Sequence, residues 1–334
     1  MFENQITNDA LNQVQHEISK AAETIATNTF SPGTRSIHSP ENLDEKIKLV
    51  VPLNAGAILR GRLGRVPGFG QAAAWKKMTS KLHSSVADGG NATVMSFADA
   101  GSPSETSQTY SSASATYKLL GRKLEVGGLH LAASRGRAGQ PDVQVDREAL
   151  KMIEVILGEE EMIIHGDTDN EANGFDGILK QITTNSGTVT FLTASGIQTH
   201  AKTIYDAGSS PTLLMANSAQ GQHLANNLEG SGSIQRTMID NQGSAVGGFA
   251  LSSIVNNIDG SKFDFRTSRY VDKTALLLTE TDPKIGNVIE MDDLIPLSRV
   301  DVPSTSFSFV SFILEATVCK VFAENWQVQL TTGT

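Results

Sequence analysis

The residues best suited to metal chemistry form the run Asp167-Thr168-Asp169-Asn170-Glu171. Hard cations such as Ca²⁺ prefer clustered carboxylate oxygens, and the run begins like a calcium-binding loop. The pattern then fails, because Ala172 stands at the sixth position where the turn requires glycine, and Ile178 stands at the twelfth where a bidentate glutamate is required. The sequence therefore indicates a solvated polar turn and predicts no metal site here.

Other motifs for catalysis or cofactor binding are missing. The seven histidines form no HExxH pair and have no cysteine partners. There is no GxxxxGK[ST] phosphate loop and no GxSxG elbow, and the glycines of residues 61–70 favour turns. The single cysteine, Cys319, lies in an alternating strand pattern that favours a small buried side chain over an activated thiolate. We expect no enzyme and no cofactor; a hydrolase-like enzyme using Asp167 or Asp169 is the alternative from another class.

Composition narrows the class of protein further. The 334 residues are 39% hydrophobic and 19% charged, so the chain can bury a sizeable core but is poor in surface charge. With 36 acidic against 27 basic residues the net charge is -9, which argues against a tight grip on phosphate backbones. The lone cysteine fits a reducing compartment. No secretory signal and no apolar run near the ~20 residues of a bilayer span are visible, so we expect no membrane partner.

The first 29 residues predict one amphipathic helix. Its apolar side chains recur at spacings of three and four, which places them on one face. They are Leu11, Val14, Ile18, Ala22 and Ile25. Ser31-Pro32-Gly33 ends the helix, and a linker is predicted as far as about Pro40. Because a lone tethered helix cannot bury its own stripe, it packs either on the body of its own chain or on a neighbour.

Residues 60–122 are rich in glycine, serine, threonine and alanine, a composition that ordinarily indicates disorder. Large side chains nevertheless recur at intervals that suit the short strands of a long hairpin. They are Trp75, Met78, Leu82, Val94, Met95, Phe97 and Tyr110. We predict a protruding hairpin, which would need a partner surface because a two-stranded ribbon is marginal in water.

Residues 146–165 have the clearest helical pattern, with one apolar stripe and the glutamates elsewhere. The stripe consists of Leu150, Ile153, Leu157 and Ile164, widened by Met152, Ile156 and Met162, and the glutamates are Glu154, Glu159, Glu160 and Glu161. Asp146 is expected to cap the start, and Gly166 to end the helix. At ~1.5 Å per residue this helix is about 30 Å long and would act as a spine.

The rest of the chain alternates strands and helices, which indicates an α/β unit. Strands are expected at 188–192 and 211–216, helices at 197–206 and 218–228, and further strands at 250–255, 263–270, 275–279 and 288–291. In the C-terminal stretch Val310, Phe312, Leu314, Ala316 and Val318 alternate with Ser311, Ile313, Glu315, Thr317 and Cys319, and a second alternation holds Trp326, Val328 and Leu330. This period of two predicts a C-terminal hairpin with one face buried.

The order of these elements resembles a known family. The spine helix is followed by Asn173-Gly174-Phe175-Asp176-Gly177-Ile178-Leu179, in which residues 174–178 match a Gly-hydrophobic-Asp-Gly-hydrophobic turn common after the spine helix in major capsid proteins of tailed bacteriophages. The resemblance covers nearly the whole chain. It implies the Hong Kong 97-like α+β fold, with an N-terminal arm, an extended hairpin called the E-loop, a peripheral domain and an axial domain. The expected boundaries are 1–45 for the arm, 46–61, 123–189 and 301–334 for the peripheral domain with its spine helix at 146–165, 62–122 for the E-loop, and 190–300 for the axial domain.

The resemblance also implies the function. The chain would be a non-enzymatic virion protein that assembles in the host cytoplasm into hexamers and pentamers of an icosahedral shell around double-stranded DNA, which it would touch only weakly. Capsid subunits of this family bury the arm and the E-loop on neighbours. The implied intersubunit contacts are therefore Leu11, Val14, Ile18, Ile25, Arg62, Arg65, Phe69, Trp75, Met78, Phe97 and Tyr110. A portal and decoration proteins are implied as further partners. Many relatives carry a long scaffolding segment before the arm, whereas here the arm begins at Met1, so we expect a separate scaffold protein or none.

An encapsulin nanocompartment, which has the same fold and encloses an enzyme instead of a genome, is the alternative within the resemblance. Some relatives crosslink lysine to asparagine between subunits, and Lys76, Lys77 and Lys81 lie in the hairpin, although loop lysines usually only solubilise. We also hypothesise that Glu154 and Glu159 to Glu161 face the shell interior, unless they simply form the solvated side of the helix.

Overall fold

The computed structural model describes residues 56–78, 97–102, 110–135, 143–230, 238–239, 245–246, 251–272 and 274–332, which all belong to the compact unit Val51–Thr334. The predicted N-terminal helix, with its stripe from Leu11 to Ile25, lies outside the described residues. Of the helices in the described ranges, none combines the length and the apolar character needed to cross a bilayer.

A four-stranded sheet has the strand order β1-β14-β15-β4. The bounds of its strands are Gly64–Pro67 for β1, Ile289–Val302 for β14, Ser308–Val321 for β15 and Lys118–Gly127 for β4. Strand β14 runs antiparallel to β15, and β15 antiparallel to β4, whereas β1 is parallel to β14. The register of β14 against β15 shifts between Asp293 and Ser298, around Pro296, which cannot donate a ladder hydrogen bond.

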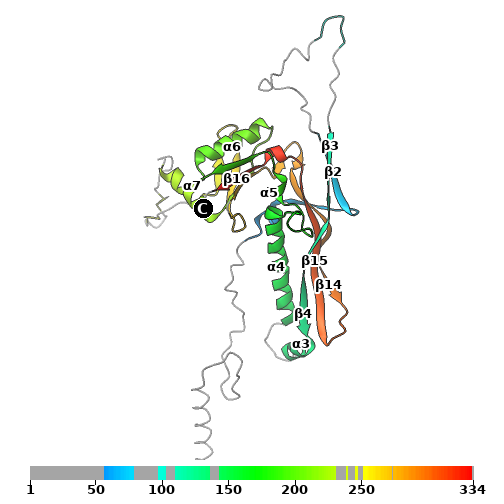
Figure 1. The fold of residues 1–334 in the computed structure, drawn as a ribbon. Coiled ribbons are helices and arrows are strands. Elements are labelled where there is room, and N and C mark those ends of the chain that lie inside the picture. Colours follow the sequence, from blue (N-terminus) through cyan, green and yellow to red (C-terminus); the bar gives the residue numbers. More distant parts are fainter. Residues whose placement is uncertain are drawn as a thin grey trace, which may run out of the picture. The chain divides into compact units, whose positions relative to one another are not determined.

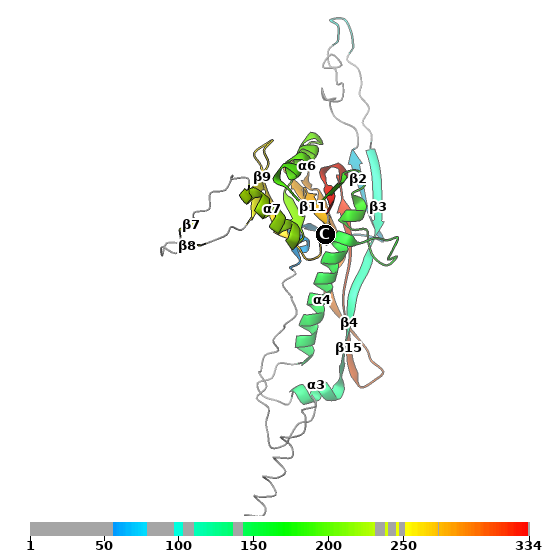
Figure 2. The ribbon, with the colours of Figure 1, turned by 60° about the vertical axis from the view of Figure 1, so that its left-hand side comes forward.

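Helix α4 (Val143–His165) lies along one face of this sheet, against β4 and β15 (Figures 1 and 2). It confirms the predicted spine helix. The expected N-cap is wrong, because the helix begins at Val143 and Asp146 therefore lies within it. Gly166 follows the last helical residue as expected, and its N–H donates to the carbonyl of Met162 at 2.8 Å. Helix α3 (Gly128–Arg135) precedes α4.

The turn after the spine helix explains the residue types of its motif. Phe175 is buried in the core, and the Asp176 carboxylate accepts hydrogen bonds from the N–H and the hydroxyl of Thr168 at 2.9 and 2.8 Å. The N–H of Gly177 donates to the carbonyl of Gly166 at 2.8 Å, and a Cβ on Gly177 would lie only 2.6 Å from the carbonyl oxygen of Met162. Helix α5 (Ile178–Gln181), whose Ile178 is fully buried, starts directly after it. Glycine is therefore required where the chain doubles back against the helix end.

A six-stranded mixed sheet has the order β5-β16-β11-β6-β10-β9. The bounds of its strands are Ser186–Val189 for β5, Val328–Thr332 for β16, Thr274–Leu278 for β11, Leu213–Ala216 for β6, Lys262–Thr267 for β10 and Ser253–Val255 for β9. Helices α6 (Ala194–Asp206) and α7 (Ser218–Gly230) occupy the positions predicted for them. Asn217 caps α7, since its side-chain oxygen accepts from the N–H of Gln220 at 2.8 Å.

The predicted C-terminal hairpin is wrong. Strand β15 pairs with β14 and β4, whereas β16 pairs with β5 and β11 in the other sheet. The short 3₁₀ helix Glu324–Trp326 stands between the two strands. Alternating apolar residues predict that a segment is a strand with two unlike faces, but they do not identify its neighbour.

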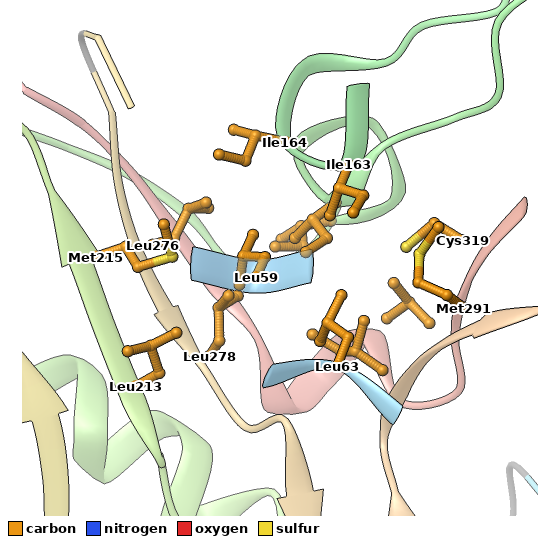
Figure 3. Packing of buried hydrophobic residues seen from close by; sticks show 14 of the residues in the cluster. Leu59, Leu63, Ile163, Ile164, Leu213, Met215, Leu276, Leu278, Met291 and Cys319 are labelled. Carbon is orange, nitrogen blue, oxygen red and sulfur yellow. The ribbon is translucent and has the colours of Figure 1, made fainter. Parts of the chain in front are cut away.

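Successive side chains of the central strands point alternately into two hydrophobic cores. Leu213 and Met215 of β6 point into a core shared with β14, β15 and α4, while Leu214 and Ala216 point into a core beneath α6. Figure 3 shows the first core, in which Leu59 lies between side chains of the two sheets. Leu59 belongs to the five-residue helix α2 (Ile58–Arg62) and is fully buried. A side chain buried in this way stabilises a fold by about 2–5 kcal/mol relative to alanine.

The remaining described strands form two-stranded pairs. They are β2 (Ala72–Met78) with β3 (Tyr110–Thr116), β7 (Met238–Ile239) with β8 (Ala245–Val246), and β12 (Thr281–Asp282) with β13 (Gly286–Asn287). The boundary expected at residue 300 falls inside β14, and β1 lies in the four-stranded sheet although it was expected in the E-loop.

Candidate intersubunit contact surfaces

The pairing of β2 with β3 confirms that the glycine- and serine-rich region holds a hairpin. Trp75 lies opposite Ala113, and the antiparallel register continues from Ala72 to Met78. Its side chains are mainly exposed or half-buried on both faces, with Ala73 as the buried exception. Within the described residues each of these two strands pairs only with the other. Residues 79–96 and 103–109, and with them Lys81, lie outside the described ranges.

The base of the hairpin is fixed by a close crossing of two segments. The hydroxyl of Tyr117 accepts a hydrogen bond from the N–H of Phe69 at 3.2 Å. A Cβ on Gly68 would lie 2.4 Å from that hydroxyl oxygen and 2.7 Å from a carboxylate oxygen of Asp292. Burial and the nearby Asp292 charge raise the pKa of Tyr117, so it remains a neutral phenol at physiological pH. The hairpin therefore leaves the four-stranded sheet from a defined point.

The aromatic candidates divide into exposed and internally packed residues. Phe69 is 81% exposed, and Phe97 and Tyr110 are also exposed. Trp75 is half-buried, and its ring meets Phe322 edge-on at a centroid distance of 6.3 Å. The side chains of Phe69, Phe97 and Tyr110 thus lie at the surface of the subunit, whereas Trp75 packs partly against its own chain. The side chain of Met78 is not among those described.

Both arginine candidates form ion pairs inside the chain. Arg62 bonds to Glu280 and, at 2.7 Å, to Asp264, and the hydrogen bond to Glu280 is the largest cause of its raised pKa. Arg65 pairs with Asp293 at 2.8 Å and with Glu159. Burial opposes ionisation of Arg65, but the two carboxylates raise its pKa. In the isolated subunit these guanidinium groups therefore bind segments of their own chain.

Two of the spine glutamates are buried inside the subunit, which corrects the expectation that they form a solvated or interior-facing side. Glu159 and Glu160 are fully buried, whereas Glu161 is exposed. The Glu160 carboxylate accepts hydrogen bonds from the backbone N–H groups of Ile58, Leu59 and Arg60 at 3.0, 2.9 and 2.8 Å. Burial still raises the pKa of Glu160 despite these three donors. This carboxylate attaches helix α2 to the spine helix.

Sequence reasoning missed an apolar surface on the four-stranded sheet. Ser311, Ile313 and Glu315 of β15 are buried on the face covered by α4, so the alternate residues face the other way. On that opposite face the register aligns Phe312 with Val300 and aligns Leu119 and Ile295 with Ala316. We call Leu119, Ile295, Val300 and Phe312 the outer apolar face; they are 68%, 37%, 45% and 38% exposed. The alternating set Val310-Phe312-Leu314 contains this signal, but a period of two predicts an apolar face without predicting whether that face is covered.

The candidate metal and nucleophile residues have structural partners. Lys180 forms an ion pair with Asp167 at 3.1 Å and with Asp169 at 2.5 Å, so the turn contains its own counterion. Across the described ranges no group of three histidine, cysteine, aspartate or glutamate side chains could hold a metal ion. Cys319 is a buried free cysteine, as its strand pattern predicted.

A spine helix along a four-stranded sheet, a hairpin that leaves this sheet and a second sheet covered by two helices together define the Hong Kong 97-like capsid fold. The chain belongs to the SU10 major capsid protein family, whose model matches residues 8–305. It is a capsid component of the virion, and capsids are built from repeated copies of such a subunit. The predicted identity and fold are therefore confirmed.

Solved structures at low sequence identity share the fold. The capsid of the native GTA particle has a TM-score of 0.56 at 12% identity, with 94% of this chain and 99% of that chain covered. The capsid of Myoviridae phage XM1 has a TM-score of 0.56 at 12% identity, covering 91% and 100%. The SrpI encapsulin of Synechococcus elongatus PCC 7942 has a TM-score of 0.56 at 11% identity, covering 93% and 94%. A comparison with curated protein sequences gives no match.

Proposed function

We propose that this capsid protein forms the hexamers and pentamers of an icosahedral phage head, and that neighbouring copies cover one another's hairpin and outer apolar face. The observation that carries the proposal is the outer apolar face itself. Four large apolar side chains in two cross-strand rows, separated by the row of Leu314, remain open to water although the opposite face of the same sheet is closed by the spine helix. Contiguous exposed apolar surface of this kind is typical of a protein contact.

Burying the outer apolar face against another protein is energetically more favourable than leaving it exposed to water. At ~25 cal/mol per Å² of apolar area, covering the exposed parts of Leu119 and Phe312 contributes about 1–2 kcal/mol each. A two-stranded hairpin is marginal in water unless it packs on another surface. Each contact is weak alone, but many equal contacts per subunit make a closed shell cooperative. Phe69, Phe97 and Tyr110 are proposed to lie in these contacts.

The net charge of -9 supports only weak contact with the enclosed double-stranded DNA, because tight binding needs clustered cations. The protein is proposed to catalyse no reaction and to assemble in the host cytoplasm. A portal, decoration proteins and a separate scaffold protein are proposed partners. Leu11, Val14, Ile18 and Ile25 of the arm are proposed contacts as well, although they lie outside the described residues.

The test replaces two residues of the outer apolar face, in the double variant Leu119→Ser with Phe312→Ser. We expect it to remain folded but to lose particles in sedimentation velocity and electron microscopy, whereas the wild type forms closed shells. Ile285→Ser is the matched control, since Ile285 is 58% exposed in the turn between β12 and β13 and belongs to no strand of this sheet. Normal assembly of the double variant, or a wild type that sediments as a compact monomer at every concentration, contradicts the proposal. The contents of the particles then separate a phage head, which holds DNA, from an encapsulin, which holds a cargo protein.

A further inference from the structure

Five charged side chains meet where the segment after the predicted arm joins the spine helix and the four-stranded sheet. Arg60 of α2 contacts Glu159 of α4 and donates to Glu315 of β15 at 3.0 Å. Arg65 of β1 contacts the same Glu159 and pairs with Asp293 of β14 at 2.8 Å. We call these residues the charged junction. Five elements of the fold therefore share one group of ion pairs.

The charges of the junction do not balance if every group is ionised. Three carboxyl groups face two guanidinium groups, and the side chains of Glu159 and Glu315 are 0% and 1% exposed. A buried charge without a counterion is costly, so such groups are normally neutralised. No described group of acidic side chains here could hold a metal ion as the missing cation.

The elements packed around Glu315 supply no further cation to it in the described part of the chain. On β4 the residue opposite Glu315 is Leu120. The neighbouring cations on the same face of β4 have other partners: Arg122 pairs with Glu154 at 2.7 Å, and Lys118 donates to the carbonyl of Ala172 at 2.6 Å. Glu160, the adjacent carboxylate on α4, accepts the backbone N–H groups of α2. Cys319, further along β15, has its pKa raised by burial and is neutral.

One oxygen of Glu315 shows where the neutralising proton belongs. Oε2 accepts from Arg60, whereas Oε1 is buried and has no hydrogen-bond partner. An ionised carboxylate with an unpartnered buried oxygen is much less favourable than the neutral acid. Burial, and then the negative charge of Glu159, raise the pKa of Glu315 to about 7.

We propose that Glu315 binds a proton in the folded subunit, and that loss of this proton weakens the attachment of α2 and β1 to the spine helix and the sheet. Once Glu315 is ionised, the junction carries an excess negative charge beside Glu159. Separation of β15 from α2 and α4 would admit water to that charge. Arg60 transmits the change, because its guanidinium contacts Glu159 and Glu315 while its backbone N–H donates to Glu160.

The direction of the pH dependence follows from proton linkage. Glu315 has a higher pKa in the folded chain than the value of 4.5 for a free side chain. Between these two pKa values the folded state binds more protons than the unfolded state, so the free energy of unfolding falls as the pH rises. The contribution is most favourable below about pH 4.5 and is lost as the pH passes through about 7. The attachment should therefore be firmer in mildly acidic than in alkaline solution.

The first experiment reads the proton directly in the full wild-type chain. Infrared spectroscopy distinguishes the C=O stretch of a neutral carboxylic acid from the bands of a carboxylate. We expect a neutral-acid band at a pH just below about 7 that titrates away above it. Its absence, or its persistence unchanged in Glu315→Gln, overturns the proposal. The titration in the wild type alone does not require that any variant folds.

The second experiment compares the pH dependence of unfolding in wild type, Glu315→Gln and the control Glu280→Gln. Glu280 is also a buried glutamate paired with an arginine, but it lies outside the junction. From about pH 5.5 to about pH 8.5 we expect the unfolding equilibrium constant of the wild type to rise at least ~10-fold more than that of Glu315→Gln. Glu280→Gln should be less stable throughout and keep the wild-type slope. Equal slopes in wild type and Glu315→Gln overturn the proposal.

The third measurement tests the structural consequence. Hydrogen exchange of the amides of Ile58, Leu59 and Arg60 reports the attachment of α2, since all three donate to Glu160. At alkaline pH we expect these amides to be less protected in the wild type than in Glu315→Gln at the same pH. Equal protection of these amides in the two proteins would mean that ionisation of Glu315 does not affect the attachment of α2, and would overturn that part of the proposal.

Discussion

The guanidinium of Arg62 donates hydrogen bonds to both carboxylate oxygens of Glu280. Its Nε lies 2.9 Å from each oxygen, and its Nη2 donates to Oε2 at 2.8 Å. Glu280 follows β11 in the six-stranded sheet, and its backbone carbonyl accepts the N–H of Val288 at 2.8 Å. Helix α2 is thus joined to the turn that connects the two sheets along the chain. Such planar two-point contacts are stronger than neutral hydrogen bonds and specific to arginine.

Arg62→Ala should lower the free energy of unfolding of the unassembled subunit by about 2–4 kcal/mol, because it leaves a nearly buried carboxylate without its partner. Arg62→Lys should recover only part of this loss, since a point charge cannot reproduce the two-point contact. Lys202→Ala is the control, as it breaks an exposed pair with Asp206 and should change stability by less than ~0.5 kcal/mol. Chemical denaturation measures all three, and an equal, small effect of Arg62→Ala and Lys202→Ala would contradict the assignment.

Local patterns in the sequence predicted the helices and the central strands well, because these depend on near neighbours. The spine helix, α6, α7 and β6 lie where periodicity placed them. Strand partners depend on residues that are far apart in the sequence. The alternation therefore predicts a hairpin of β15 and β16, whereas the two strands belong to different sheets. A period of two also does not say which face is covered. In β15 the spine helix covers the face that holds Ser311 and Glu315, so the apolar face remains outside.

The buried glutamates show that charge patterns, like strand patterns, do not predict partners that lie far apart in the sequence. Three consecutive glutamates on a helix usually form its solvated side, and Glu161 does. Glu159 and Glu160 are buried because Arg60, Arg65 and the N–H groups of α2 reach them from about a hundred residues away in the chain. The sequence contained both partners but not their proximity. Of the intersubunit contact candidates, Phe69, Phe97 and Tyr110 are exposed, whereas the two arginines are paired internally.

Gly177→Ala should destabilise the subunit by about 1–3 kcal/mol or more, because the new Cβ would lie 2.6 Å from the carbonyl oxygen of Met162 and 2.9 Å from that of Ile163. These are backbone atoms of the spine helix and cannot swing aside. Gly158→Ala, within the same helix, meets no atom within 4 Å and should be neutral or stabilise by up to ~1 kcal/mol through helix propensity. The midpoints of thermal unfolding of the two variants test this prediction. Similar midpoints would contradict it and show that the turn accommodates the added Cβ.

Cys319 should resist thiol reagents in the native protein. Burial, and secondarily the charge of Glu159, raise the pKa of its thiol to about 12, so almost no thiolate is present at neutral pH. We expect iodoacetamide to label the folded chain only as fast as the core opens, and to label the denatured chain completely. Because this is the single cysteine, mass spectrometry of the intact chain measures the modified fraction directly. Rapid labelling of the folded protein would show that this end of β15 is accessible.

Glu160→Ala should release helix α2 from the spine helix, whereas Glu161→Ala should not. The two residues are neighbours on α4 with the same side chain, but only the Glu160 carboxylate accepts the N–H groups of Ile58, Leu59 and Arg60, while Glu161 is exposed. Without that carboxylate three backbone donors at the start of α2 lose their acceptor in a mostly buried site, where each unsatisfied group costs about 1–3 kcal/mol. Water can satisfy these donors only if the first turn of α2 moves outward.

Hydrogen exchange of residues 58–60 should therefore accelerate by at least ~10-fold in Glu160→Ala, a loss of ~1.4 kcal/mol of local protection, and stay at the wild-type rate in Glu161→Ala. Amides of β6, buried in both cores, are the internal reference, and faster exchange there would mean that the substitution loosened the whole subunit and that the specific role of Glu160 is wrong.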